Sequence, residues 1–81
     1  MEYYLFLARS VTRAQKMEAE LRRRGIHADI VRPPVQLSEK GCAYALRLTP
    51  RRFRPAMQAL QSTGLTPTKV FYYNGERYEE L

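Results

Sequence analysis

Apolar residues recur along the chain in two different periods, and these periods predict strands and helices. The continuous apolar run 3–8 is typical of a buried strand. From Ser10, a favourable N-cap, apolar residues recur at helical spacing until Gly25 ends the helix. The dipeptide Asn74-Gly75 is typical of a hairpin turn. The same criteria predict the remaining elements, which are strands over 27–32, 42–48, 69–73 and 76–79 and a second helix between Thr49-Pro50 and Gly64.

The two halves of the chain repeat at a constant spacing. Leu60 follows Leu21 by 39 positions, and Gly64 follows Gly25 by the same 39 positions. Two tandem βαβ units predict an α+β, ferredoxin-like βαββαβ sandwich with an antiparallel sheet in the order 4-1-3-2 and both helices on one face. We expect a single domain over residues 1–81, with a short C-terminal hairpin strand. The residues predicted to lie under the sheet are Met17, Leu21, Phe53, Met57 and Leu60.

The same spacing relates the first and third strands and suggests which residues face the helices. Tyr44 follows Leu5 by 39 positions, as Leu46 follows Leu7, and one arrangement has these four residues facing the helices. The opposite face of the sheet is then open and partly apolar, which is typical of a homodimer interface. Its residues are Tyr4, Phe6, Ala43, Ala45 and Arg47.

RNA-recognition domains share this topology and stack bases on aromatic residues of the two central strands. The first strand offers Tyr4 and Phe6 for stacking, but the third strand offers only Ala43 and Ala45 at the corresponding places. The sequence therefore disfavours nucleic acid as a partner, and RNA binding is kept as an alternative.

The composition places the chain among ordinary globular domains. It has 81 residues, of which 44% are apolar and 27% charged, enough for one domain with a small core. No apolar run approaches the roughly 18 residues of a membrane span, and the run 3–8 is too short for a signal peptide. A single cysteine cannot form an internal disulfide. We expect a soluble, cytoplasmic protein that does not bind membranes.

The net charge and the motifs of the sequence limit the kinds of partner and reaction that we expect. The formal net charge of +6 favours an anionic partner such as nucleic acid, phosphate, a sulfur oxyanion or an acidic protein surface. His27 is the only histidine, and CxxC, zinc-ligand spacings and Gly-rich phosphate loops do not occur in the sequence. We therefore expect no metal, no cofactor and no enzymatic activity.

The predicted topology brings Cys42, at the start of the third strand, near the start of the first helix. A helix N-terminus and nearby cations favour a thiolate, so we expect this thiol to titrate below the roughly 8.5 of a free cysteine. The alternative is that Cys42 is a small apolar residue at a strand start and that the cations are merely solvated. The candidate anion-binding residues at this end are Arg9, Ser10, Arg13, Arg32 and Lys40.

The chain resembles the Se/S carrier protein-like family of small bacterial domains over residues 2–73. The residues that carry the resemblance are Tyr3-Tyr4-Leu5-Phe6 leading to Ser10, Arg24-Gly25-Ile26, Pro33, Leu37-Ser38, Cys42 and Ala45-Leu46-Arg47. The family usually has glycine directly after the cysteine, whereas here Ala43 stands there and Gly41 precedes it. The resemblance implies that Cys42 carries sulfur or selenium as a persulfide or selenosulfide, with a donor or acceptor protein as partner.

A second basic cluster surrounds the predicted start of the second helix. Cations oppose the helix dipole at this place, so the cluster favours an acidic docking partner or an anion over a purely structural role. A solvated run of charges is the alternative interpretation, and a small-ligand regulatory module that uses the arginines without the thiol is the alternative function. The candidate docking residues are Arg47, Arg51, Arg52 and Arg54.

Overall fold

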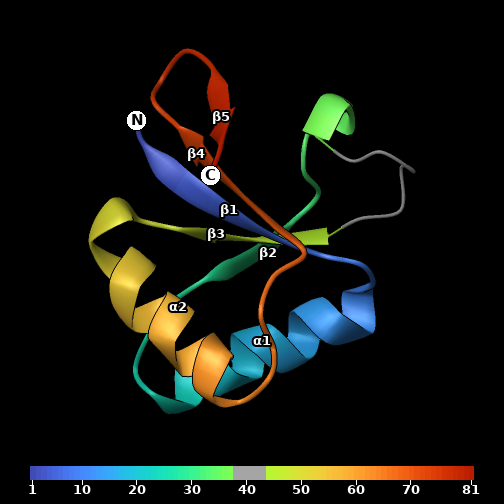
Figure 1. Cartoon of the computed structure of the whole chain (residues 1–81), viewed down its shortest axis with the longest axis vertical. Helices are drawn as coiled ribbons and strands as arrows, with labels where there is room; N and C mark the ends of the chain where they lie inside the picture. Colours follow the sequence, from blue (N-terminus) through green and yellow to red (C-terminus); the bar gives the residue numbers. More distant parts are fainter. Residues whose placement is uncertain (38–43) are drawn as a thin grey trace.

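The structure is a computed structural model that describes residues 1–37 and 44–81. Two helices and a five-stranded antiparallel sheet form an α+β domain (Figure 1). The elements are β1 (Tyr3–Ala8), α1 (Val11–Arg23), β2 (Asp29–Val31), the 3-10 turn η1 (Val35–Leu37), β3 (Tyr44–Leu48), the 3-10 turn η2 (Pro50–Arg52), α2 (Phe53–Ser62), β4 (Lys69–Tyr73) and β5 (Tyr78–Glu80).

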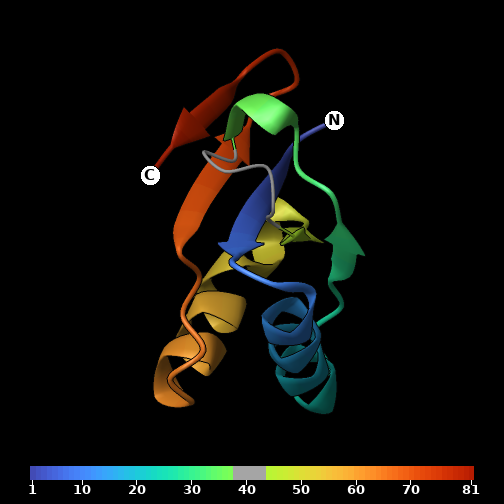
Figure 2. The same ribbon diagram turned by 90° about the vertical axis from the view of Figure 1, so that its right-hand side faces the viewer.

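The strands of the sheet lie in the order β2-β3-β1-β4-β5, and every neighbouring pair is antiparallel. This order differs from the expected four-strand order 4-1-3-2 because β5 extends the sheet beyond β4. Both helices lie on the same side of the sheet, and η1 and the β4–β5 hairpin lie at the end of the molecule away from them (Figures 1 and 2).

Several element boundaries differ from those predicted. Thr49 makes no side-chain cap, and the chain forms the η2 turn before α2 begins at Phe53. The β4–β5 hairpin turns at Gly75 and Glu76, because the Asn74 amide donates to the Arg77 carbonyl (3.2 Å). The turn therefore lies one residue after the predicted Asn74-Gly75 pair, and the Asn74 Oδ1 accepts hydrogen bonds from the amides of Glu76 and Arg77. The third strand is described from Tyr44 onward, so its predicted start lies outside the described residues.

The two helices end in the same way, as the repeat predicts. The Ile26 amide donates to the Leu21 carbonyl at the end of α1, and the Leu65 amide donates to the Leu60 carbonyl at the end of α2 (both 2.9 Å). These bonds are those of the Schellman motif, which requires a left-handed residue between helix and loop. Gly25 and Gly64 supply it with φ of 74° and 72°.

Replacing either glycine with alanine should destabilise the fold by about 1–2 kcal/mol, since a side chain disfavours positive φ. A Cβ at either position meets no atom within 4 Å, so the cost comes from the backbone alone. Gly25→Ala and Gly64→Ala should therefore lower the free energy of unfolding by similar amounts in urea titrations. Clearly unequal losses of unfolding free energy would show that the C-terminal ends of the two helices are not equivalent.

The core lies between the sheet and the helices. Met17, Leu21 and Leu60 are buried in it, and Phe53 and Met57 pack against it, as predicted. Among the described residues, the buried members of this cluster come from both helices, the helix-facing side of the sheet and the loop before β2: Phe6, Ala8, Ala14, Met17, Leu21, Ala28, Leu46, Leu48, Ala56, Ala59, Leu60 and Val70.

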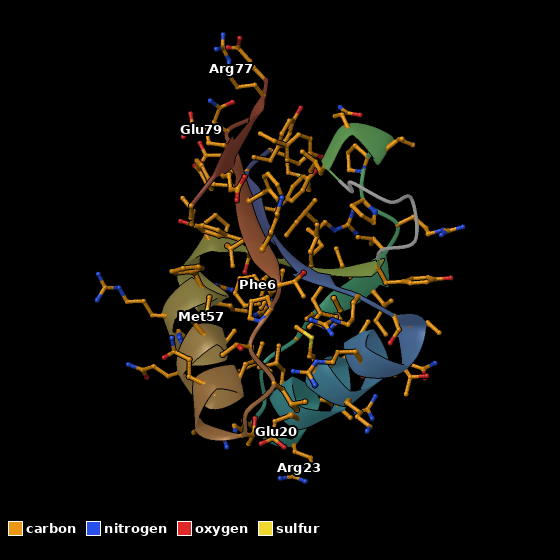
Figure 3. The ribbon with its side chains drawn as sticks, turned by 45° about the vertical axis from the view of Figure 1, so that its right-hand side comes forward. Phe6, Glu20, Arg23, Met57, Arg77 and Glu79 are labelled. Atoms are coloured by element: carbon orange, nitrogen blue, oxygen red, sulfur yellow. The ribbon has the colours of Figure 1, made fainter. Side chains whose placement is uncertain are left out.

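The arrangement in which Leu5 and Leu7 face the helices does not hold for β1. Phe6 is 0% exposed and lies between the sheet and the helices, as Figure 3 shows, while Leu5 and Leu7 lie on the opposite face. Phe6 is the antiparallel partner of Leu46, and directly opposed residues share a face of the sheet. The predicted orientation of Leu46 toward the helices is therefore confirmed, and Phe6 joins it there.

The face of the sheet away from the helices is not an open apolar surface. Leu37 of η1 and Tyr78 of β5 pack against a second cluster on this face. The buried members of the cluster are Leu5, Leu7, Ala45 and Phe71. A stacking platform made of Tyr4 and Phe6 is thus not present on this face. The homodimer stays a prediction without the apolar surface from which it was inferred.

Candidate functional site

Two of the predicted anion-binding arginines share one hollow. Arg9, directly after β1, and Arg13, in the first turn of α1, line an open cavity of about 310 Å³. Its other wall is the loop that leads into β4, formed by Thr66, Pro67 and Thr68. The hollow therefore lies where the end of β1, the start of α1 and the start of β4 meet.

Hydrogen bonds hold the walls of this hollow in place. The Arg13 Nη2 donates to the Gly64 carbonyl (3.2 Å), which links the start of α1 to the end of α2. The Thr68 amide (2.9 Å) and hydroxyl (3.2 Å) both donate to the Leu7 carbonyl. The Ser10 hydroxyl accepts from the Arg13 amide (3.1 Å), so it caps α1 as predicted.

The hollow is positively charged. Among the described residues, no carboxylate lies within 4 Å of the guanidinium of Arg9 or Arg13. The arginines near the other end of α1 differ, because Arg22 pairs with Glu18 (3.0 Å) and Arg24 with Glu20 (2.8 Å). Figure 3 shows Glu20 and Arg23 side by side there. Within residues 1–37 and 44–81, no acidic side chain neutralises the charge of Arg9 and Arg13.

The other predicted residues of this end divide into two groups. The Arg32 guanidinium lies 5.0 Å from the centre of the Tyr44 ring, in a cation–π contact, and does not line the hollow. Cys42 and Lys40 lie outside the described residues. Tyr44, two positions after Cys42 in the sequence, pairs with Ala8, the residue before Arg9.

The second basic cluster is only partly brought together. Arg47 pairs with Asp29 (3.4 Å) and contacts the Tyr3 ring, and Arg47 and Arg52 share a hollow of about 200 Å³ with His27. This hollow lies at the start of β1, the opposite end from Arg9. Arg51 and Arg54 are exposed and line none of the hollows described here.

Sequence patterns did not single out Thr66, Pro67 or Thr68. The predicted topology could have located these three residues, because β4 is antiparallel to β1 and Lys69 pairs with Leu7. The loop before β4 must therefore lie beside the residues after β1. Among the described residues, no three His, Cys, Asp or Glu side chains come together as metal ligands.

A third hollow, of about 450 Å³, lies along the β4–β5 hairpin and includes Tyr3, Tyr73 and Tyr78. Burial, together with the hydrogen bond between the Tyr3 and Tyr78 hydroxyls, raises the pKa of Tyr78 to about 12. Nearby, the hydrogen bond from the Tyr72 hydroxyl to the Glu2 carboxylate (2.6 Å) raises the pKa of Tyr72 to about 12. Both shifts favour the neutral phenol in the folded protein.

Stability should therefore fall at alkaline pH. The contribution of these two phenols is complete below the ordinary tyrosine pKa of about 10 and is lost as the pH rises to about 12. In a spectrophotometric titration of the six tyrosines, Tyr78→Phe and Tyr72→Phe should each remove one late-ionising group. Tyrosinate absorbance that is complete near pH 11 would contradict this expectation.

A family model described as "Putative Se/S carrier protein-like" matches residues 3–72. The chain belongs to this Se/S carrier protein-like family. Comparison with curated proteins and with solved structures gives no significant match.

The match to the Se/S carrier protein-like family includes Cys42 and every residue that lines the hollow at the start of α1. The β5 strand, which extends the sheet beyond β4, lies outside the matched range. Within the described residues, neither helix has the length and apolar character required to cross a membrane.

Proposed function

We propose that the protein is a non-enzymatic, cytoplasmic carrier that holds sulfur or selenium on Cys42 and exchanges it with a donor or acceptor protein. Membership of the Se/S carrier protein-like family supports the cargo. The observation that carries the rest of the proposal is the pair of arginines, Arg9 and Arg13, in one hollow without a carboxylate among the described residues. These cations stabilise the anionic sulfur or selenium of the loaded state.

The loading step needs no oxidant. The Cys42 thiolate attacks the terminal sulfur of a donor persulfide, a new S–S bond forms on Cys42, and the donor thiolate leaves with the electron pair. Selenium transfer follows the same exchange and forms an S–Se bond. The reverse exchange delivers the cargo to an acceptor thiolate. A neighbouring positive charge favours each anionic partner in these exchanges.

Docking of the partner uses a different part of the surface. Arg51 and Arg54 are exposed at the start of α2, where the first turn contains no acidic residue. Because these cations oppose the helix dipole, an acidic surface of the donor or acceptor stabilises them. Charge reversal there should reduce transfer between proteins and leave loading by a small molecule unchanged.

The direct test is intact-mass measurement after incubation with glutathione persulfide. The wild-type chain should gain the mass of one sulfur atom, and this gain should disappear on treatment with a thiol reductant. Cys42→Ser should gain nothing, and because the chain has one cysteine no other thiol competes. A wild-type chain that gains no sulfur, or a serine variant that gains as much, would contradict the carrier function.

A further inference from the structure

We propose that the hollow lined by Arg9, Arg13, Thr66, Pro67 and Thr68 binds a tetrahedral oxyanion of the phosphate or sulfate class. The biological role of this site rests on the proposed function, because the bound oxyanion would be a small ligand of the carrier in addition to its protein partners. The binding itself depends only on residues that the structure describes and does not require the thiol.

The size and shape of the hollow suit a small ligand. Its volume of about 310 Å³ lies at the lower end of the roughly 300–1,000 Å³ typical of ligand sites. Its walls come from two loops that are far apart in the sequence, one around Arg9 and one over residues 66–68. A concave site between two loops can contact an ion from opposite sides, which a solvated arginine on a convex surface does not do.

The walls are held in place before any ligand binds. Arg13 is tethered to the Gly64 carbonyl, and Thr68 is tethered twice to the Leu7 carbonyl. Pro67 fixes one backbone angle of the loop between them. A site whose walls are already ordered loses little entropy when it binds, so a small ion gains most of its interaction energy.

The donors in the hollow match an oxyanion and do not match a cation. Each guanidinium carries five N–H donors and no acceptor, and the tether to Gly64 occupies a single nitrogen of Arg13. Arg9 makes no hydrogen bond to any described residue, and the Thr66 hydroxyl is likewise without a described partner. Planar guanidinium groups pair in a bidentate manner with phosphate and sulfate oxygens. An anion bound between the two arginines also relieves their mutual repulsion.

Titration with inorganic phosphate at constant ionic strength, followed by amide NMR of the full chain, tests the site. The largest saturable shifts should fall on Arg9, Arg13, Thr66 and Thr68. Arg9→Gln should raise Kd about fivefold or more and leave the rest of the spectrum unchanged, because this exposed side chain forms no hydrogen bond or ion pair with the described residues. Arg54→Gln, which removes the same charge at the start of α2, should leave Kd unchanged.

Two further experiments complete the test. The first distinguishes a free ion from a phosphate group on a larger molecule, and the second distinguishes anion binding from sulfur loading. A phosphomonoester that binds more tightly than inorganic phosphate identifies the ligand as a group on a larger molecule, and equal or weaker binding identifies it as the free ion. Cys42→Ser should bind phosphate like the wild type although it carries no sulfur, so failure of loading and failure of anion binding are observed independently. Shifts that do not saturate, or that Arg9→Gln and Arg54→Gln reduce equally, would overturn the oxyanion site.

Discussion

Replacing Phe6 with alanine should lower the free energy of unfolding by about 3–5 kcal/mol, the cost typical of removing a buried aromatic side chain. Phe6 is 0% exposed, and its ring lies edge-on to that of Phe53 with 5.8 Å between the centroids. The alanine variant leaves a cavity in the layer where β1, β3 and α2 meet. Urea denaturation followed by circular dichroism measures the loss.

A loss of this size approaches the whole stability expected of an 81-residue domain, about 4–12 kcal/mol. Phe6→Leu, which should cost about 1 kcal/mol, therefore provides a folded variant for the same measurement. Val35→Ala is the control, because Val35 is 80% exposed and its loss should change stability by no more than about 0.5 kcal/mol. If Phe6→Ala unfolds at the wild-type urea concentration, Phe6 does not pack in the core between the sheet and the helices.

The misplaced face of β1 has a simple cause in the repeat. Leu21 and Leu60, which are equivalent in the two helices, are 39 positions apart. The strand residues that face the helices, Phe6 and Leu46, are 40 positions apart. Side chains alternate between faces along a strand, so this one-residue difference moves every residue of β1 to the other side of the sheet. The run 3–8 is apolar on both faces and therefore did not reveal the shift.

The elements themselves were predictable because their ends carry specific residues. Ser10 begins α1 through a cap, and Gly25 and Gly64 end the helices through a backbone conformation that other residues disfavour. The start of α2 was less predictable, because Thr49 has a capping side chain but makes no cap. The hairpin turn lies one residue later than predicted, because Asn74 pairs with Arg77 and its side chain accepts hydrogen bonds from the amides of Glu76 and Arg77.

Sequence reasoning could predict the part of the candidate site whose residues are close together in the sequence. Arg9 and Arg13 flank a single N-cap, so their proximity is a local property of the sequence. The threonines opposite them are more than 50 positions away and lie there because β4 pairs with β1. Arg32 was grouped with the site because it follows β2, but its guanidinium stacks on Tyr44 instead. Such tertiary contacts decide which of several arginine side chains line a hollow, and the sequence does not reveal them.

Reversing the charge of both arginines, as Arg9→Glu with Arg13→Glu, should slow alkylation of Cys42 by iodoacetamide at neutral pH about three- to tenfold. The thiolate is the reacting species, and two anions in place of two cations reduce the fraction of thiol that is ionised. The effect should shrink at high salt, because salt screens charges at a solvated site. The chain contains one cysteine, so the measured rate belongs to Cys42 alone.

Loss of structure does not account for slower alkylation in this variant. The first turn of α1 has no acidic residue, and Arg13→Glu introduces one three positions after Ser10, which completes a capping box. A carboxylate there should stabilise the helix by about 0.3–1 kcal/mol, which offsets the lost bond to Gly64. Thermal unfolding of the variant should confirm that it is folded at the temperature of the alkylation assay.

The matched control is Arg51→Glu with Arg54→Glu, which carries the same net charge and places both changes at the start of the other helix. That helix follows the end of β3 that pairs with the beginning of β1, so its start lies at the opposite end of the sheet from Arg9. The control should react at nearly the wild-type rate. If both double variants slow alkylation equally, the thiol responds only to the net charge of the protein, and Arg9 and Arg13 serve anion binding in the hollow without acting on Cys42.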